Sequence, residues 1–167
     1  MSMFEICPEA PDNAPAVDAL LDKTFGPGRF AKTAYRLRED VQPIESLSLV
    51  ARAQGLLVGS IRFWPVVIGP SQAPALLLGP LAVEPELKGQ GIGVGLMTQG
   101  LQAAKALGYE VVILVGDEPY YARVGFARVP AGQIRMPGPV DPARLLFVEL
   151  KAKAFENSCG EIKRCLR

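Results

Sequence analysis

Histidine is absent from this sequence of 167 residues, and cysteine is scarce. Without an imidazole the chain has no Ser–His or Cys–His catalytic pair and no histidine-ligated metal. The three cysteines are Cys7, Cys159 and Cys165, and no two of them have the Cys-x-x-Cys spacing. A tetrahedral zinc site made only of cysteine needs one thiol more than this chain has. We therefore expect no metal, free thiols, and a reducing compartment, the cytoplasm.

An excess of charge of one sign is also lacking. Lysine and arginine number 18 and aspartate and glutamate 17, for a net charge of +1. Nucleic-acid-binding proteins normally carry a basic excess or stripe, so we expect no nucleic-acid partner. No apolar run reaches the roughly 20 residues that span a bilayer. Residues 1–5 resemble no signal peptide, so we also expect no membrane partner.

Hydrophobic residues make up 49% of the chain, enough for a sizeable core in a single domain over residues 1–167. Apolar periodicity and turn residues predict a mixed α/β sheet with a βαβ unit at its centre. The basic tail, with Lys163, Arg164 and Arg167, is expected to be solvated. Asp12 or Asn13 is expected to cap the first helix. The expected strands cover residues 4–7, 47–53, 56–68, 76–83, 110–115 and 145–150, and the expected helices residues 12–23, 31–39, 91–107 and 119–124.

The strand at residues 76–83 is apolar on both faces and should be central in the sheet. Gly79-Pro80 interrupts it. Proline cannot donate to a strand ladder, so the pair predicts a bulge or a local loss of pairing. The alternative is that the strand begins only at Leu81.

A glycine-rich stretch follows this strand and opens the helix at residues 91–107. Helix N-termini expose unpaired N–H groups and a partial positive charge, and glycine lets the backbone approach an anion closely. The stretch therefore indicates a phosphate-bearing ligand. Its spacing fits neither the dinucleotide fingerprint nor the lysine-containing phosphate loop.

Two motifs together are more specific. Lys88-Gly-Gln-Gly-Ile-Gly93, after Leu81-Ala-Val83, resembles the acyl-CoA signature of the GNAT superfamily of N-acyltransferases, although Lys88 replaces the usual Arg or Gln. Tyr120-Tyr-Ala-Arg-Val-Gly-Phe126 resembles the second signature of that family and is similar to its YhbS-type branch. The Asn that is frequent after the strand at residues 110–115 is absent, and Asp117 stands nearby.

The resemblance implies the GNAT fold, a mostly antiparallel central sheet that splays between its fourth and fifth strands and is flanked by helices. It also implies acetyl-CoA as co-substrate, without a metal or a covalent enzyme intermediate. Pantetheine would pair with the backbone of Leu81, Ala82 and Val83, and an N–H near Leu81 would hold the oxyanion. The pyrophosphate would lie on the residues of the glycine loop: Lys88, Gly89, Gln90, Gly91, Ile92 and Gly93.

Tyr121 is the candidate to protonate the leaving thiolate, and we expect Tyr120 to serve packing; the alternative for Tyr121 is a core aromatic. With reference pKa values of about 10 for tyrosine and 8.5 for a thiol, the transfer is uphill by roughly 2 kcal/mol. Glu84, Asp117 or Glu118, acting through water, are the candidate bases.

The sequence thus predicts an N-acetyltransferase that acts on an amine of a small molecule or a protein. Two alternatives are an acyl-CoA-binding sensor without turnover and an enzyme for a longer acyl donor. The segment at residues 25–30 is an acceptor-facing loop or a plain turn, in which Arg29 meets an acidic acceptor or faces water. Phe63 and Trp64 are expected in the core rather than in an acyl pocket. A homodimer is possible, as in many members of the family.

Overall fold

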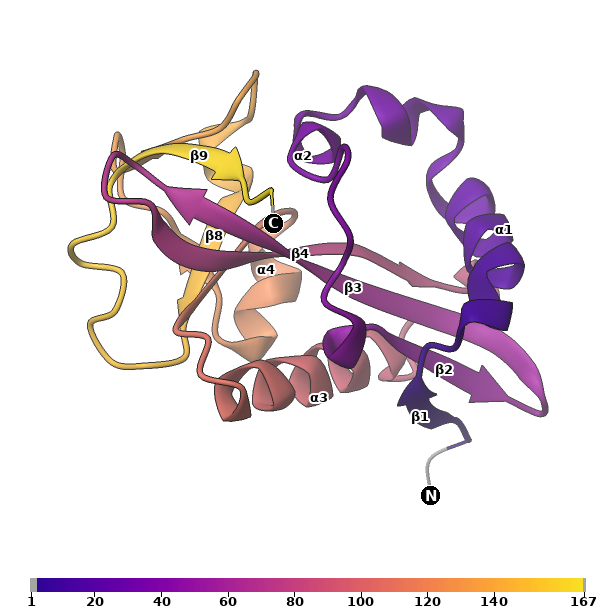
Figure 1. Cartoon of the computed structure of the whole chain (residues 1–167). Helices are drawn as coiled ribbons and strands as arrows, with labels where there is room; N and C mark the ends of the chain where they lie inside the picture. Colours follow the sequence, from indigo (N-terminus) through magenta and orange to yellow (C-terminus); the bar gives the residue numbers. More distant parts are fainter. Residues whose placement is uncertain (1–2, 167) are drawn as a thin grey trace.

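Nine strands form the framework of the computed structural model, which describes residues 3–166 (Figure 1). One path through the sheet runs β1-β2-β3-β4-β5-β8-β6, while β9 pairs with β3 and with β7. Neighbours along that path are antiparallel except for β4 and β5, which run parallel. The strands are β1 (Glu5–Pro8), β2 (Leu49–Ala53), β3 (Leu56–Ile68), β4 (Ala73–Val83), β5 (Val111–Val115), β6 (Ala127–Arg128), β7 (Ile134–Arg135), β8 (Leu145–Glu149) and β9 (Gly160–Arg164).

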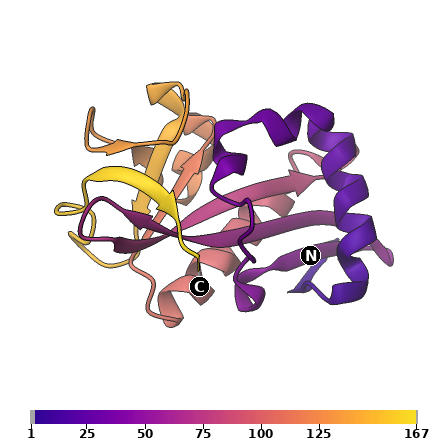
Figure 2. The same cartoon turned by 45° about the horizontal axis from the view of Figure 1, so that its top comes forward.

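Helices cover both faces of this sheet (Figures 1 and 2). The helix α3 (Ile92–Ala106) packs on β2, β3 and β4 from one face, and α1 (Ala14–Phe25) packs on β3 and β4 from the other. Val50 is buried under α1, whereas its neighbours Leu49 and Ala51 belong to the core under α3. This two-sided cover explains why Val50 breaks the polar alternation of its strand. The short helices are α2 (Thr33–Arg36) and α4 (Glu118–Tyr121).

A glycine inside α3 allows close packing of that helix on the sheet. A β-carbon added to Gly100 would lie 2.6 Å from a ring carbon of Phe63, closer than real contacts permit. Gly100 therefore lets the helix approach β3 at the cost of intrinsic helix propensity, about 1 kcal/mol relative to alanine. Phe63 itself is completely buried, as expected of a core residue.

The predicted bulge in β4 is confirmed. Ile61 pairs with Leu81 and Phe63 with Leu78, so Gly79 and Pro80 together face the single residue between Ile61 and Phe63. The strand is continuous from Ala73 to Val83, and the alternative start at Leu81 is wrong.

The predicted loss of pairing beside the bulge is confirmed as well. The strand β5 pairs with β4 only at Leu76–Leu77, opposite Val112–Ile113. Beyond these residues the sheet opens between its fourth and fifth strands, as the family resemblance implies.

Two expectations about local structure need correction. Asn13 stands at the start of α1, but its side chain accepts a hydrogen bond from the amide of Ala10 (2.7 Å) rather than capping the helix. The helix expected at residues 31–39 is only α2, because the chain turns after Arg36 and buries Leu37. A short 3-10 helix, η2 (Pro27–Ala31), precedes α2.

Residues 160–164 of the C-terminal segment form the strand β9, which the sequence did not predict, whereas the predicted solvation holds for Lys163. Ile162 is 1% exposed and pairs with Ile68 of β3, while Glu161 and Lys163 face solvent. The alternation of Ile162 with charged neighbours fits a strand that buries one face. Arg167 lies outside the described residues.

Candidate active site

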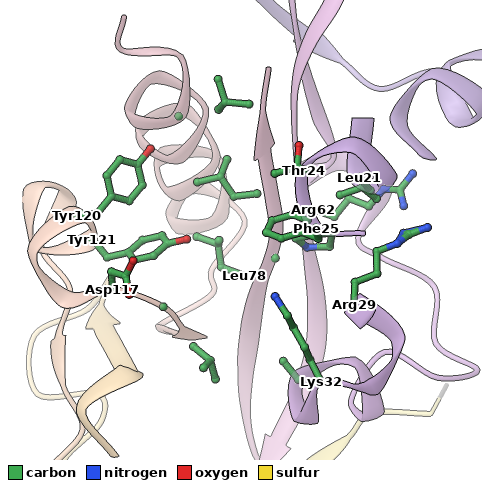
Figure 3. Close-up of a pocket in the computed structure, with 18 of the residues that line it drawn as sticks. Leu21, Thr24, Phe25, Arg29, Lys32, Arg62, Leu78, Asp117, Tyr120 and Tyr121 are labelled. Atoms are coloured by element: carbon green, nitrogen blue, oxygen red, sulfur yellow. The ribbon is translucent and has the colours of Figure 1, made fainter. Parts of the chain in front are cut away.

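A cavity of about 1520 Å³ occupies the opening between β4 and β5 (Figure 3). The segment from α1 to α2 forms one wall, and the end of β5 with α4 forms the other. Residues 78–83 of β4 and the start of α3 also line it, with the exception of Ala82. The two sequence motifs therefore meet in one space, because the sheet fails to close there.

Trp64 supports the bulge that borders this cavity. Its indole N–H donates a hydrogen bond to the carbonyl oxygen of Gly79. Trp64 is 8% exposed, belongs to a buried cluster and also lines the cavity. The expectation of a core residue is correct, but the structure adds that this residue satisfies a backbone acceptor freed by the bulge.

The glycine loop has the backbone geometry that an anion site needs. Gly89 and Gly91 have φ angles of +85° and +86°, a region that favours glycine. The first amides of α3 have no intrahelical acceptor, as in any helix. The capping residue Gly91 has no side chain that could accept from them. Lys88 is exposed at the edge of the loop and lines the cavity.

Most of the residues predicted to bind the cofactor line the cavity. The exceptions are Ala82, which is 1% exposed and packs under α1, and Gln90. Those that line it are Leu81, Val83, Lys88, Gly89, Gly91, Ile92 and Gly93.

Tyr121 points its hydroxyl into the cavity, toward Leu78 on β4 (Figure 3). Its ring packs edge-on against Phe126, with 6.0 Å between ring centroids, and lies over Gly116. Burial raises the pKa of this phenol to about 12. The side chain is thus both a packed aromatic and a protonated donor facing the cavity.

Tyr120 contributes more than the packing expected of it. Its ring meets that of Tyr121 edge-on, with centroids 5.1 Å apart, and its hydroxyl lies against Gly93 of the glycine loop. Burial raises the pKa of Tyr120 as well. Arg123 lies 5.9 Å from the centre of this ring and lines the cavity, a cation that the sequence reasoning did not single out. The position of Arg123 inside the second motif is the sequence feature that could have identified it.

The three candidate bases lie in different surroundings. Glu84 forms an ion pair with Lys23, which raises the pKa of that lysine, and Glu118 forms one with Arg128 at 3.0 Å. Neither carboxylate lines the cavity, whereas Asp117 does. Asp117 is 78% exposed and 3.8 Å from Arg144, so its carboxylate is accessible to water.

The predicted acceptor loop also borders the cavity. Phe25, Arg29 and Phe30 line it, and Arg29 forms an ion pair with Asp22 at 3.1 Å. Only 17% of the Arg29 side chain is exposed, so the alternative that it simply faces water is wrong.

Residues 3–166 contain neither a metal-binding cluster nor a membrane-spanning helix. No group of three or more His, Cys, Asp or Glu is placed to hold a metal ion there. No helix in the same range is long and apolar enough to cross a bilayer.

An antiparallel sheet that opens at one parallel strand pair, with a glycine-rich helix start beside the opening, defines an acyltransferase class of protein. Residues 14–128 match the model of the acetyltransferase (GNAT) family. The chain belongs to this family, and the acyltransferase class predicted from the two motifs is confirmed.

Relatives place the chain near one branch of the family. It is 36% identical over 119 residues to the uncharacterized N-acetyltransferase YhbS of Escherichia coli K12, covering 71% of this chain and 70% of that protein. A crystal structure of E. coli YhbS in complex with CoA superposes with a TM-score of 0.83 at 29% identity, over 99% of this chain and 91% of that one. A GNAT acetyltransferase from Brucella melitensis in complex with acetyl-CoA gives 0.63 at 27% identity, over 93% and 99%. The predicted fold and branch resemblance are thereby confirmed.

Proposed function

We propose that the protein is an acetyl-CoA-dependent N-acetyltransferase that acetylates a primary amine of a small molecule or a protein. One observation carries the proposal: the open edge of β4 and the glycine loop line the same cavity. Two similar structures hold CoA and acetyl-CoA, which supports the same ligand here.

The loop and the strand edge have separate roles in binding. The free amides at the start of α3, with Lys88 and Arg123 beside them, suit the pyrophosphate. The side of β4 that faces the opening has unpaired backbone groups from Leu81 to Val83, which suit the amides of pantetheine. An N–H near Leu81 polarises the thioester carbonyl and stabilises the oxyanion.

The reaction is a direct attack by the amine on the thioester carbonyl. A C–N bond forms, the C–S bond breaks, and the nitrogen loses a proton to water. A Lys-type amine is neutral only at a cost of roughly 4.6 kcal/mol at pH 7, whereas an α-amine costs about 1 kcal/mol. Asp117 is the proposed base acting through that water, because Glu84 and Glu118 are held in ion pairs outside the cavity.

Tyr121 is the proposed donor to the departing sulfur. Since burial raises its pKa to about 12, the phenol stays protonated at every working pH. Complete transfer to a thiolate with a reference pKa of 8.5 would be uphill by about 5 kcal/mol. We therefore propose that the Tyr121 hydroxyl donates a hydrogen bond to the developing thiolate. Burial also raises the pKa of the thiol, which allows the proton to pass to the sulfur as it leaves.

Calorimetry with CoA and release of free thiol from acetyl-CoA with a panel of amines test this function. We expect CoA binding and turnover of at least one amine. Binding without turnover would favour the acyl-CoA sensor, and faster turnover of propionyl- or butyryl-CoA would favour a longer acyl donor. The Tyr121 hydroxyl in the cavity favours the enzyme, since a sensor needs no proton donor. Absence of CoA binding would contradict the proposal.

We also propose a cytoplasmic location, supported by the free thiols of Cys7, Cys159 and Cys165. A single domain over residues 1–167 and a homodimer stay predictions. Size-exclusion chromatography with light scattering measures the oligomeric state.

A further inference from the structure

Positive charge gathers in the cavity although the chain is nearly neutral. Eight lysine and arginine side chains line the cavity against four aspartates, whereas the whole chain has a net charge of +1. Five of these cations lie on the wall built by β3 and the segment from η2 to the turn after α2. Arg36 donates a hydrogen bond to the carbonyl oxygen of Pro137, and the other four form what we call the cationic wall. This cationic wall consists of Arg29, Lys32, Arg38 and Arg62.

The wall is only partly neutralised by the protein itself. Arg62 forms two hydrogen bonds with the carboxylate of Glu9, both at 3.0 Å, and Arg29 pairs with Asp22. Lys32 and Arg38 form no ion pair within residues 3–166. Two cations of the wall therefore have charge that a bound anion could balance.

The guanidinium groups of the wall also keep unused donors. The Nε atoms of Arg29 and Arg38 are buried without a hydrogen-bond partner within the described residues. An unpaired buried donor typically costs 1–3 kcal/mol. Burial, with the nearby charges of Arg29 and Arg62, lowers the pKa of Arg38 to about 10. An anion at this wall would relieve both penalties.

Lys32 extends from the wall toward the middle of the cavity. Its ammonium lies 4.8 Å from the centre of the Phe25 ring and points into the cavity between Phe25 and Leu78 (Figure 3). Tyr121 points toward Leu78 from the opposite wall. A molecule between the two walls would therefore meet Lys32 on one side and the Tyr121 hydroxyl on the other.

We propose, on the basis of the proposed function, that the amine acceptor carries an anionic oxygen group, a carboxylate or a phosphate, and that the cationic wall binds this group. Guanidinium groups match the geometry of both anions. Binding the anion at the wall leaves the amine directed toward the thioester near Leu81. The phosphates of CoA are served by other cations, Lys88 and Arg123, at the glycine loop.

Anion binding to CoA-saturated protein tests the wall without knowledge of the acceptor. The probes are glutarate and inorganic phosphate, each compared with sodium chloride at equal ionic strength, and the readout is Tm. We expect at least one probe to raise Tm in the wild type and in Lys105→Glu, an exposed change on α3 outside the cavity. The rise should disappear in Lys32→Glu. No rise with either probe, or an equal rise in Lys32→Glu, would overturn the inference. The probe that raises Tm shows whether the wall binds a carboxylate or a phosphate.

Matched amines test the same wall in turnover. The pairs are phenylalanine against phenethylamine and phosphoethanolamine against ethanolamine. We expect kcat/KM to be roughly tenfold or more higher for an anionic member, and to fall by a similar factor in Lys32→Glu. The Kd for CoA should stay within about twofold. Equal turnover of neutral amines would refute the anionic acceptor but leave the acetyltransferase standing. Loss of CoA affinity in Lys32→Glu would assign the wall to CoA instead.

Discussion

The hydroxyl of Tyr120 lies against Gly93, in the space that a β-carbon on that residue would fill. Gly93→Ala must therefore displace either Tyr120 or the first turn of α3. We expect the Kd for CoA to rise roughly tenfold, about 1.4 kcal/mol, because the loop amides lose their alignment. Isothermal titration calorimetry measures this change.

Gly95→Ala is the matched control for this substitution. It adds the same methyl group to the same helix, but outside the cavity and 3.3 Å from the flexible end of Ile6. CoA affinity should be unchanged in the control. Tyr120→Phe added to Gly93→Ala should restore part of the affinity, and an unaffected Kd in Gly93→Ala would contradict the assigned role of the loop.

Trp64→Phe removes the donor to the Gly79 carbonyl oxygen. A buried acceptor without a partner should lower the free energy of unfolding by about 1–3 kcal/mol, and kcat should fall because the bulge loses its support. Ile68→Val in the same strand should cost about 0.5–1.5 kcal/mol and leave kcat unchanged. Denaturant unfolding and steady-state kinetics distinguish the two variants. An unchanged kcat in Trp64→Phe would show that the bulge keeps its shape without this hydrogen bond.

Tyr121→Phe should lower kcat by about 100-fold, with little effect on the KM for acetyl-CoA, because only the donor to the leaving sulfur is lost. Since the pKa of Tyr121 is about 12, its ionisation should give no alkaline limb in the wild-type pH–rate profile up to pH 10. Full kcat in Tyr121→Phe would remove this residue from the mechanism.

The same raised pKa makes a prediction for stability. The phenol holds its proton more tightly in the folded state than in the unfolded chain, where its pKa is near 10. Its contribution to stability is therefore complete below pH 10 and is lost as the pH rises to 12. The difference in unfolding free energy between wild type and Tyr121→Phe should shift by about 3 kcal/mol across this range. A constant difference would mean that Tyr121 is not buried in solution.

Asp117→Asn should lower kcat/KM at pH 7 by about 100-fold for an amine with a pKa near 10, and less for an α-amine that is already largely deprotonated. Glu84→Gln and Glu118→Gln are the comparison variants, because their carboxylates lie outside the cavity. Equal, small effects of all three changes would leave water as the base.

Local chemistry determined a large part of this protein. Gly79-Pro80 predicted the bulge because proline cannot donate to a neighbouring strand. The glycines from Gly89 to Gly93 predicted an anion site because they let the backbone at a helix N-terminus approach an anion closely. The two motifs indicated the family because each is a short, continuous segment whose residues act together. By contrast, the strand at residues 160–164 was missed, since its pairing with β3 depends on residues almost a hundred positions away.

Only the tertiary structure decided how separate segments share the cavity. It brought Asp117 to the cavity and left Glu84 and Glu118 in ion pairs outside it, although all three look alike in the sequence. It also gathered the cations of η2, the turn after α2 and β3 on one wall. The physical reason is that backbone preferences act between near neighbours, whereas burial and charge depend on which distant segments the packed core places side by side.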